Sequence, residues 1–233
     1  MVIHFEGILD GTTATLIILS STIFGLLSLY KSIKLKAKLL TIAALMMFFV
    51  GCLWLGPTVD FFMVLLSGEN ISPIEVYSLL SYLWVAPALI FAIWLGGELI
   101  FPKRKWIFVG IFIVLGVIFE YFLWFQTDAS FTWELVNPGE DLIDAHFVRT
   151  HPTFLMIAVF LVSALVFLGI GFAIKAKQST GQLRRKFTYL SIGNIIFVLC
   201  GALDSILTIP LAIGVVRIVM ATFALWMYLG LKT

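Results

Sequence analysis

Long, unbroken runs of apolar residues recur seven times along this chain of 233 residues. Each run is close to the ~20 residues that an α-helix needs to cross the hydrocarbon core of a bilayer. The sequence therefore predicts an all-α membrane protein, a seven-transmembrane helix bundle that forms a single domain over residues 1–233. The expected spans are Thr12–Tyr30, Leu39–Val59, Val76–Phe101, Trp106–Phe125, Pro152–Ile174, Phe187–Ile206 and Pro210–Leu231.

Charged residues are scarce, because they make up only 12% of the chain against a usual ~25%. A soluble domain of this length could not cover its surface with so few charges. Soluble enzymes, nucleic-acid binders and disulfide-stapled secreted domains are therefore excluded. The apolar runs are also continuous and do not alternate with polar residues, which excludes a transmembrane β-barrel.

The basic residues lie mostly between alternate spans. Thirteen of the fifteen Lys and Arg residues follow spans one, three, five and seven, whereas Arg149 lies on the opposite side and Arg217 lies inside a span. Short cytoplasmic loops carry an excess of Lys and Arg, so we expect a multi-pass cell-membrane protein with an extracellular N-terminus and a cytoplasmic C-terminus. The basic loops would contact lipid headgroups rather than nucleic acid. Only Lys232 and Thr233 follow the last span, so we expect a separate signalling partner or a second copy of the chain.

One connection, from Gln126 to His151, is much longer than the others and lies on the predicted outer side between spans four and five. Two interpretations are open. The segment is either an ordered cap or interfacial helix over the bundle, or a lid over an outward-facing pocket. Long ordered loops often carry binding residues.

Ionisable residues inside a bilayer are costly, usually face the bundle interior and suggest functional sites. Near the cytoplasmic end of span three, Glu98 is within reach of the basic residues 103–105. Counting the helical rise from the ends of the spans places the other four in the outer half of the membrane: Asp60, Glu120, Asp204 and Arg217.

Arg217 needs a carboxylate partner at that depth, because its guanidinium group does not lose its proton. Asp204 is the best candidate, since a tight turn joins spans six and seven. One interpretation is a structural ion pair that holds these two helices together. The other is the charged floor of a ligand or ion site, and a buried pair alone does not distinguish between them.

Aromatic residues near a proline suggest one wall of such a site. Pro87 should kink span three and free a backbone carbonyl, and Tyr82 and Trp84 lie about one turn before it, although interfacial or core packing is the alternative. We therefore expect an outward-opening cavity that binds a small cationic or amine ligand, because three carboxylates outnumber one guanidinium group. The candidate ligand-binding residues are Asp60, Tyr82, Trp84, Glu120, Asp204 and Arg217.

No catalytic or cofactor-binding motif accompanies this set. His4, His146 and His151 all lie in outer segments, so no histidine pair faces inward to hold a haem. The spacing of Asp144 and the two nearby histidines is not specific for a metal, and the chain carries no nucleophile motif or glycine-rich phosphate loop. We therefore expect no enzyme activity, no cofactor and no metal site.

Spans two and six resemble each other weakly. A shift of 148 residues places Lys38 on Lys186, and it also aligns Phe49 with Phe197, Val50 with Val198 and Cys52 with Cys200. Chance is one explanation. The other is a parallel repeat in a three-plus-one-plus-three helix arrangement, which some small sugar transporters use. A small-solute or ion transporter or channel is therefore the alternative function.

Three stretches carry a family resemblance: residues 38–61, the sequence Tyr-Leu-Trp-Val-Ala-Pro at 82–87, and Leu-Arg-Arg-Lys-Phe at 183–187 leading to Gly193 and Gly201. They resemble the seven-helix N-terminal sensor region of prokaryotic membrane histidine kinases. The closing pattern, Gly-Ala-Leu-Asp at 201–204 followed by Arg217 and Tyr-Leu-Gly at 228–230, is similar to related archaeal membrane proteins that lack the kinase. The resemblance implies a sensor or receptor-like bundle with an outward-facing ligand pocket, and it implies no particular ligand.

Overall fold

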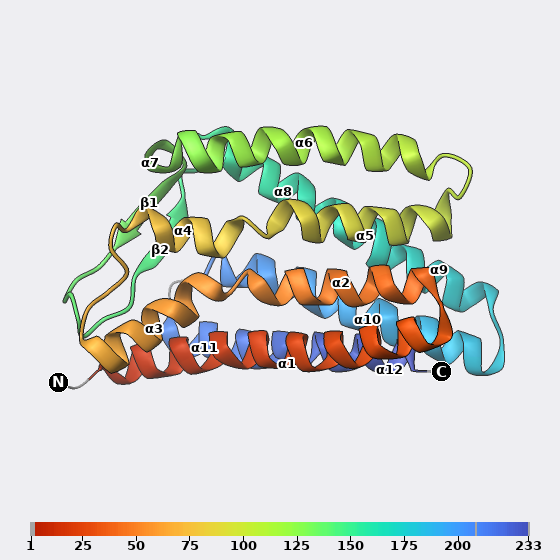
Figure 1. The fold of residues 1–233 in the computed structure, drawn as a ribbon, viewed down its shortest axis with the longest axis horizontal. Helices are drawn as coiled ribbons and strands as arrows, with labels where there is room; N and C mark the ends of the chain where they lie inside the picture. The colour runs from red at the N-terminus through yellow and green to blue at the C-terminus, as the bar shows by residue number, and fades with distance from the viewer. Residues whose placement is uncertain (1–2, 208, 233) are drawn as a thin grey trace.

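The computed structural model describes residues 3–207 and 209–232 as an α-helical bundle with one small sheet (Figure 1). Among these residues, six helical segments are long and apolar enough to cross a membrane, or seven if the bent pair α2–α3 counts as one span. The chain is therefore a multi-pass membrane protein. Its elements are α1 (Phe5–Leu35), α2 (Lys38–Cys52), α3 (Leu55–Ser67), α4 (Glu75–Tyr82), α5 (Val85–Ile100), α6 (Lys105–Phe125), α7 (Thr127–Ser130), β1 (Phe131–Glu134), β2 (Asp144–Phe147), α8 (Pro152–Ala164), the π-helical segment η1 (Leu165–Ile170), α9 (Gly171–Gln178), α10 (Gly181–Asp204), α11 (Pro210–Ala221) and α12 (Phe223–Leu231).

Several helices extend beyond the predicted spans. Helix α1 begins at Phe5 where the apolar run predicted Thr12, and α10 begins at Gly181 where it predicted Phe187. The helical backbone satisfies its own hydrogen bonds, so it continues past the apolar run into polar sequence. This extension places Glu6 and Asp10 inside α1, which the apolar run alone did not indicate.

The long connection contains a small two-stranded sheet that the sequence analysis did not predict. Strand β1 pairs antiparallel with β2, with Phe131 opposite Phe147 and Glu134 opposite Asp144. Along β1 the buried Phe131 and half-buried Trp133 alternate with exposed residues, which is the two-residue period of a strand with one covered face.

The two ends of the bundle differ in their connections and charges. The N-terminus, α7 and the β1–β2 hairpin lie at one end, here named the hairpin end (Figure 1). The C-terminus and the α1–α2, α5–α6 and α9–α10 connections lie at the other, here named the basic end. The Lys and Arg residues that the sequence places between alternate spans therefore gather at the basic end.

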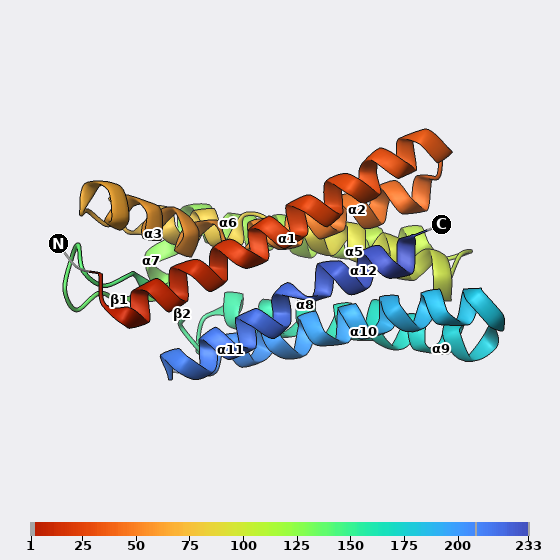
Figure 2. The same ribbon diagram turned by 90° about the horizontal axis from the view of Figure 1, so that it is seen from below.

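Figure 2 shows two layers of helices, with α1 to α6 in one and α8 to α12 in the other. The layers meet where α11 and α12 pack against α1, and toward the basic end α12 also contacts α2. A buried apolar core fills this half of the bundle, with side chains such as Met46, Met47, Phe172, Phe223 and Met227.

Small residues on α1 allow its close approach to its neighbours. Gly7, Ala14, Ser21 and Ser28, which are seven residues apart, are all buried. A side chain added at Gly11, on the same helix, would overlap the ring of Phe61 on α3. Helices in a bilayer associate through such close packing, because lipid tails are as apolar as the helix surfaces.

Spans two and three are interrupted at similar local sequences. Leu-Trp-Leu-Gly-Pro occupies residues 53–57 and Leu-Trp-Val-Ala-Pro occupies residues 83–87. Each proline lacks the N–H group that would bond to the carbonyl four residues earlier, so the carbonyls of Leu53 and Leu83 lose their helical partners. The α2–α3 pair bends by 46° at the first motif, and α4 gives way to α5 at the second, as the proline predicted.

Two further interruptions receive hydrogen bonds from neighbouring helices. Ser20 of α1 donates to the carbonyl oxygen of Ala221, where α11 ends, at 2.8 Å. Ser191 of α10 donates to the carbonyl oxygen of Gly169 in η1 at 2.7 Å. Irregular backbone is tolerated at membrane depth when other protein groups satisfy it or when it lines a cavity.

Candidate functional site

A cavity of about 430 Å³ extends from the hairpin end into the middle of the bundle. Exposed residues such as Glu6 and Glu134 line its mouth, and Leu168, Asn194 and Phe223 line its deepest part. Its volume lies within the range of ~300–1,000 Å³ that is typical of small-molecule sites. Leu168 and Phe223 also belong to the apolar core, so the floor of the cavity rests on the packed half of the bundle.

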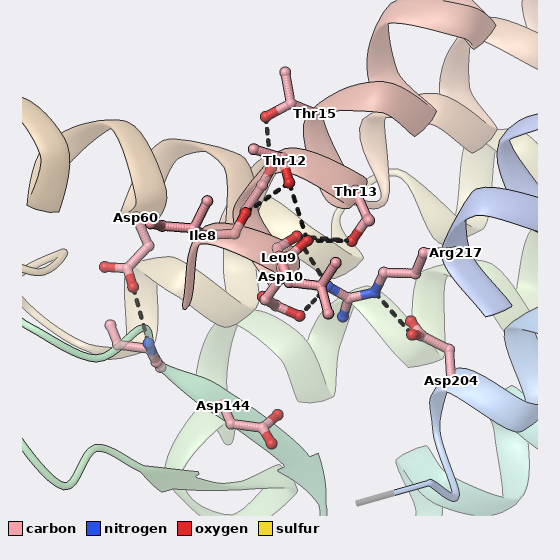
Figure 3. Close-up of polar contacts among 12 residues, drawn as sticks. Ile8, Leu9, Asp10, Thr12, Thr13, Thr15, Asp60, Asp144, Asp204 and Arg217 are labelled. Carbon is pink, nitrogen blue, oxygen red and sulfur yellow. Dashed lines mark hydrogen bonds and ion pairs between the residues drawn. The ribbon is translucent and has the colours of Figure 1, made fainter. Parts of the chain in front are cut away.

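Three helices meet at Arg217, on one side of the cavity. Its Nε donates to Asp204 Oδ1 at 2.8 Å, and its Nη1 donates to Asp10 Oδ1 (Figure 3). The side chains of Arg217 and Asp204 are only 11% and 14% exposed. The predicted pairing of these two residues is confirmed, and the group joins α1, α10 and α11.

Asp10 is the charged residue that the sequence analysis missed. The predicted first span began at Thr12, which left Asp10 in an outer segment. In the structure Asp10 lies on α1, four and seven residues before the buried Ala14 and Ile17. That spacing places all three on one helical face, and it is the sequence signal that could have revealed Asp10.

Asp60 lies outside the cavity and anchors the loops at the hairpin end. It is fully buried, and its carboxylate accepts hydrogen bonds from the backbone N–H groups of Ile71 and Ile143, both at 2.9 Å. The side-chain amide of Asn70 donates to the same carboxylate at 3.1 Å. The expectation that Asp60 surrounds the cavity is therefore not met, because its oxygens are occupied by these donors.

The hairpin is fixed over the cavity mouth by Asn70. The Asn70 side chain donates to the carbonyl oxygen of Asp141 at 2.9 Å and accepts from the N–H of Gly139 at 2.7 Å. Trp133 donates to Ser78 Oγ at 2.9 Å. These contacts attach the 126–151 connection to the bundle, and several of its residues, including Asp144 and His146, line the cavity.

Of the two aromatic residues predicted to line the cavity, Tyr82 does so and Trp84 does not. Tyr82 lines the cavity and packs against Phe131 and Phe147 of the hairpin, with ring centroids 5.0 and 4.7 Å apart. Trp84 lies outside the cavity lining and stacks on Phe49 of α2 at 5.9 Å. The break at residues 83–84 turns the two side chains in different directions, so proximity in sequence did not predict a shared wall.

Glu120 of α6 also lies outside the cavity lining. Both of its carboxylate oxygens are buried, and neither has a hydrogen-bond partner among the described residues. The position of a residue along a helix does not indicate which face of the helix it occupies. The cavity therefore brings together Tyr82, Asp204 and Arg217 from the predicted set, and not Asp60, Trp84 or Glu120.

Carboxylates outnumber cations around the cavity mouth. Arg217 and His146 are the basic residues of the lining, and His146 Nε2 lies 3.2 Å from Asp144 Oδ2. The acidic residues of the lining are Glu6, Asp10, Glu134, Asp141, Asp144 and Asp204. An excess of fixed negative charge around a partly enclosed space favours a cationic ligand.

Metal ligands do not gather at this mouth. Within residues 3–207 and 209–232, no group of three or more His, Cys, Asp or Glu side chains has the arrangement of a metal site. His151, which follows His146 closely in sequence, instead contacts Gln126 Oε1 at 3.3 Å and caps α8.

The remaining residue pair at this end, His4 and Asp141, should make the attachment of the hairpin pH-dependent. His4 Nδ1 lies 2.6 Å from Asp141 Oδ1. This hydrogen bond raises the pKa of His4 above its ordinary 6.5 and lowers the pKa of Asp141 below its ordinary 3.8, and the charges of Glu140 and Glu6 further favour protonated His4. Since folding raises the pKa of His4 and lowers the pKa of Asp141, the stabilisation is complete between about pH 3.8 and pH 6.5. It is lost as the pH rises through the folded pKa of His4, and also as the pH falls through the folded pKa of Asp141.

We expect backbone amides of residues 139–143 to be better protected from hydrogen exchange at about pH 5.5 than at about pH 8.5, after correction for the intrinsic exchange rate. The variant His4→Gln should lose this difference, whereas His146→Gln, which keeps His4, should retain it. Equal protection of the wild type at both pH values would contradict the assignment.

A scan against protein-family models finds no family that matches this chain, and a search of curated proteins finds no match. The cavity and the charges around it are therefore the basis for a proposed function.

Proposed function

We propose that this chain is a sensor or receptor-like protein of the cell membrane, with an extracellular N-terminus, a cytoplasmic C-terminus and a ligand pocket that faces outward. One observation carries the proposal: the cavity opens at the hairpin end, and the packed core closes the bundle toward the basic end. A one-sided cavity suits ligand binding better than passage of a solute across the membrane.

The orientation is supported by the distribution of charge. The connections at the basic end carry most of the Lys and Arg residues, and such connections are usually cytoplasmic. The resemblance to the sensor regions of membrane histidine kinases supports the same class of function, and here the output would pass to a separate partner.

Binding is a better proposal than catalysis because backbone carbonyls occupy the serine hydroxyl groups of the cavity lining. Ser81 donates to the carbonyl of Tyr77 at 2.9 Å, and Ser205 donates to the carbonyl of Gly201 at 3.0 Å. A serine nucleophile needs an adjacent base to activate it, and these hydroxyl groups instead bond to backbone within their own helices.

The Arg217 group supplies a route from ligand to helix movement. Arg217 holds α1 and α10 to α11 through Asp10 and Asp204. A cationic ligand at the mouth would compete with Arg217 for these carboxylates, and so shift the relative stability of two helix arrangements. Helix α12 continues from α11 toward the basic end, where a partner would bind.

A small-solute transporter is the second candidate, and the interrupted spans favour it. Transporters often build their substrate site from discontinuous helices, and Leu53 and Pro57, at the break between α2 and α3, line this cavity. The two members of the weak repeat differ in shape, however, because α2–α3 bends by 46° while α10 is continuous.

Accessibility of single cysteines separates the two candidates without any known ligand. Glu140→Cys at the hairpin end and Lys34→Cys at the basic end report the orientation, and Ala164→Cys reports the cavity wall. The native Cys52 and Cys200 are buried and lie outside the cavity lining. We expect a membrane-impermeant cationic thiol reagent to label Glu140→Cys and Ala164→Cys only from outside, and Lys34→Cys only from the cytoplasm.

Two results would contradict this proposal. Labelling of Lys34→Cys from outside would reverse the topology. Labelling of Ala164→Cys from both sides would favour alternating access, and therefore the transporter. The wild-type protein, treated in the same way, controls for reaction at the two native cysteines.

A further inference from the structure

We propose that the cavity binds an elongated organic ammonium ion, with its charged group at the mouth and a hydrogen-bond donor at its far end that reaches Asn194. The proposal rests on the outward-facing pocket of the proposed function and adds the chemical class of the ligand. It is carried by three zones of the cavity, which differ in chemistry.

The mouth provides the site for the ammonium group. The Asp144 side chain is 60% exposed, and its only ion-pair partner among the described residues is His146. Tyr77 lines the same cavity and is only 5% exposed, yet its hydroxyl group makes no hydrogen bond with any described residue. A hydroxyl group on a cavity-lining residue that has no hydrogen-bond partner within the protein is available to a ligand.

The middle part of the cavity, between the mouth and the floor, has an apolar and aromatic wall. Tyr82, Phe160 and Phe197 line it, and Trp54 lies on the same surface. Aromatic faces attract organic cations, and burial of hydrocarbon here would contribute about 25 cal/mol per Å² of apolar surface. An inorganic cation would leave this surface without a partner, which is why we infer a ligand with an organic body.

The floor provides a hydrogen-bond acceptor. Asn194 is 3% exposed, and its Nδ2 donates to the carbonyl oxygen of Leu190 at 2.8 Å and to Met227 Sδ at 3.1 Å. Its Oδ1 accepts no hydrogen bond from any described residue, and the residue lines the cavity. With both donor bonds directed into the protein, the oxygen is left for a donor on the ligand.

The distance between mouth and floor sets the length of the ligand. Asn194 and Asp204 lie ten residues apart on the continuous helix α10, which corresponds to about 15 Å along its axis. The acidic mouth and Asn194 are thus separated by several helical turns, so a ligand that meets both zones has an extended body, and short amines reach only one of them.

A matched series of probes tests each zone with the full-length protein in lipid nanodiscs. The probes are 8-amino-1-octanol, octylamine without the terminal hydroxyl group, 1,8-octanediol without the charge, and 2-aminoethanol without the body. We expect 8-amino-1-octanol to bind at least about tenfold more tightly than each of the others, because each lacks one recognised group. Empty nanodiscs control for partition into lipid.

Variants locate the recognition. Asp144→Asn should weaken the binding of 8-amino-1-octanol about tenfold and leave the affinity for 1,8-octanediol unchanged. Asn194→Leu should reduce the affinity for 8-amino-1-octanol to that for octylamine. Asp128→Asn, at an exposed acid of the hairpin end outside the cavity, is the matched control. If Asn194→Leu does not fold, the probe series on the wild type still tests the floor.

If 2-aminoethanol binds as tightly as 8-amino-1-octanol, the proposal of an elongated ligand is wrong. If 1,8-octanediol binds as tightly as 8-amino-1-octanol, the proposal of an ammonium group at the mouth is wrong. Either result leaves the proposed function intact, because the one-sided labelling of Ala164→Cys needs no ligand. Conversely, labelling of that cysteine from both sides would contradict the sensor, whatever the probes do.

Discussion

Replacing Arg217 with methionine should destabilise the folded protein by about 3–5 kcal/mol, because removal of one member of a buried ion pair leaves the other charge without compensation. Here two carboxylates, of Asp10 and Asp204, would remain close together in a membrane-embedded site. The free energy of unfolding can be measured by titration with SDS in mixed micelles. The control variant Arg149→Met removes an exposed arginine at the same end of the bundle. It should change the free energy of unfolding by no more than about 0.5 kcal/mol.

Charge removal from the whole group distinguishes an electrostatic cause from simple loss of packing. Asp204→Asn should cost less than Arg217→Met, because Arg217 keeps Asp10 as a partner. The triple variant with Asp10→Asn, Arg217→Met and Asp204→Asn should recover most of the lost stability, since no unpaired charge remains. A triple variant as unstable as Arg217→Met alone would show that shape, and not charge, holds these helices.

The helical fold could be predicted from the sequence because the bilayer imposes a length on each apolar run. Helix ends were less accurate, since the backbone of α1 continues through polar residues that a hydropathy pattern excludes. The hairpin was not predicted, because its strands contain four residues each. A signal this short is easily missed, although the alternation of Phe131 and Trp133 with polar residues is present in the sequence.

The candidate site was predicted only in part, for a geometric reason. The tight turn between the last two spans correctly predicted that Asp204 pairs with Arg217. The direction of a side chain around the helix axis depends on which neighbours the helix packs against, and Glu120 and Trp84 therefore point away from the cavity. Asp60 lies at the hairpin end, as its position in the chain indicates, but backbone donors from two distant loops surround it.

Replacing Asp60 with alanine should destabilise the hairpin end strongly and loosen the cover of the cavity. The variant leaves the N–H groups of Ile71 and Ile143 and the amide of Asn70 without their shared acceptor. Each buried donor that loses its partner costs about 1–3 kcal/mol, so the backbone pair alone predicts a loss of roughly 2–6 kcal/mol in unfolding free energy.

Hydrogen exchange can locate this effect. Protection should fall at Ile71 and Ile143, and the loss should extend through Asn70 to Gly139, because Asn70 connects the carboxylate to the loop. Asp60→Asn retains one acceptor oxygen and should show an intermediate effect, whereas Asp128→Ala removes an exposed carboxylate and should show none. Unchanged exchange at Gly139 in Asp60→Ala would mean that the loop holds its position over the cavity without Asp60, and that this buried carboxylate has a role other than anchoring it.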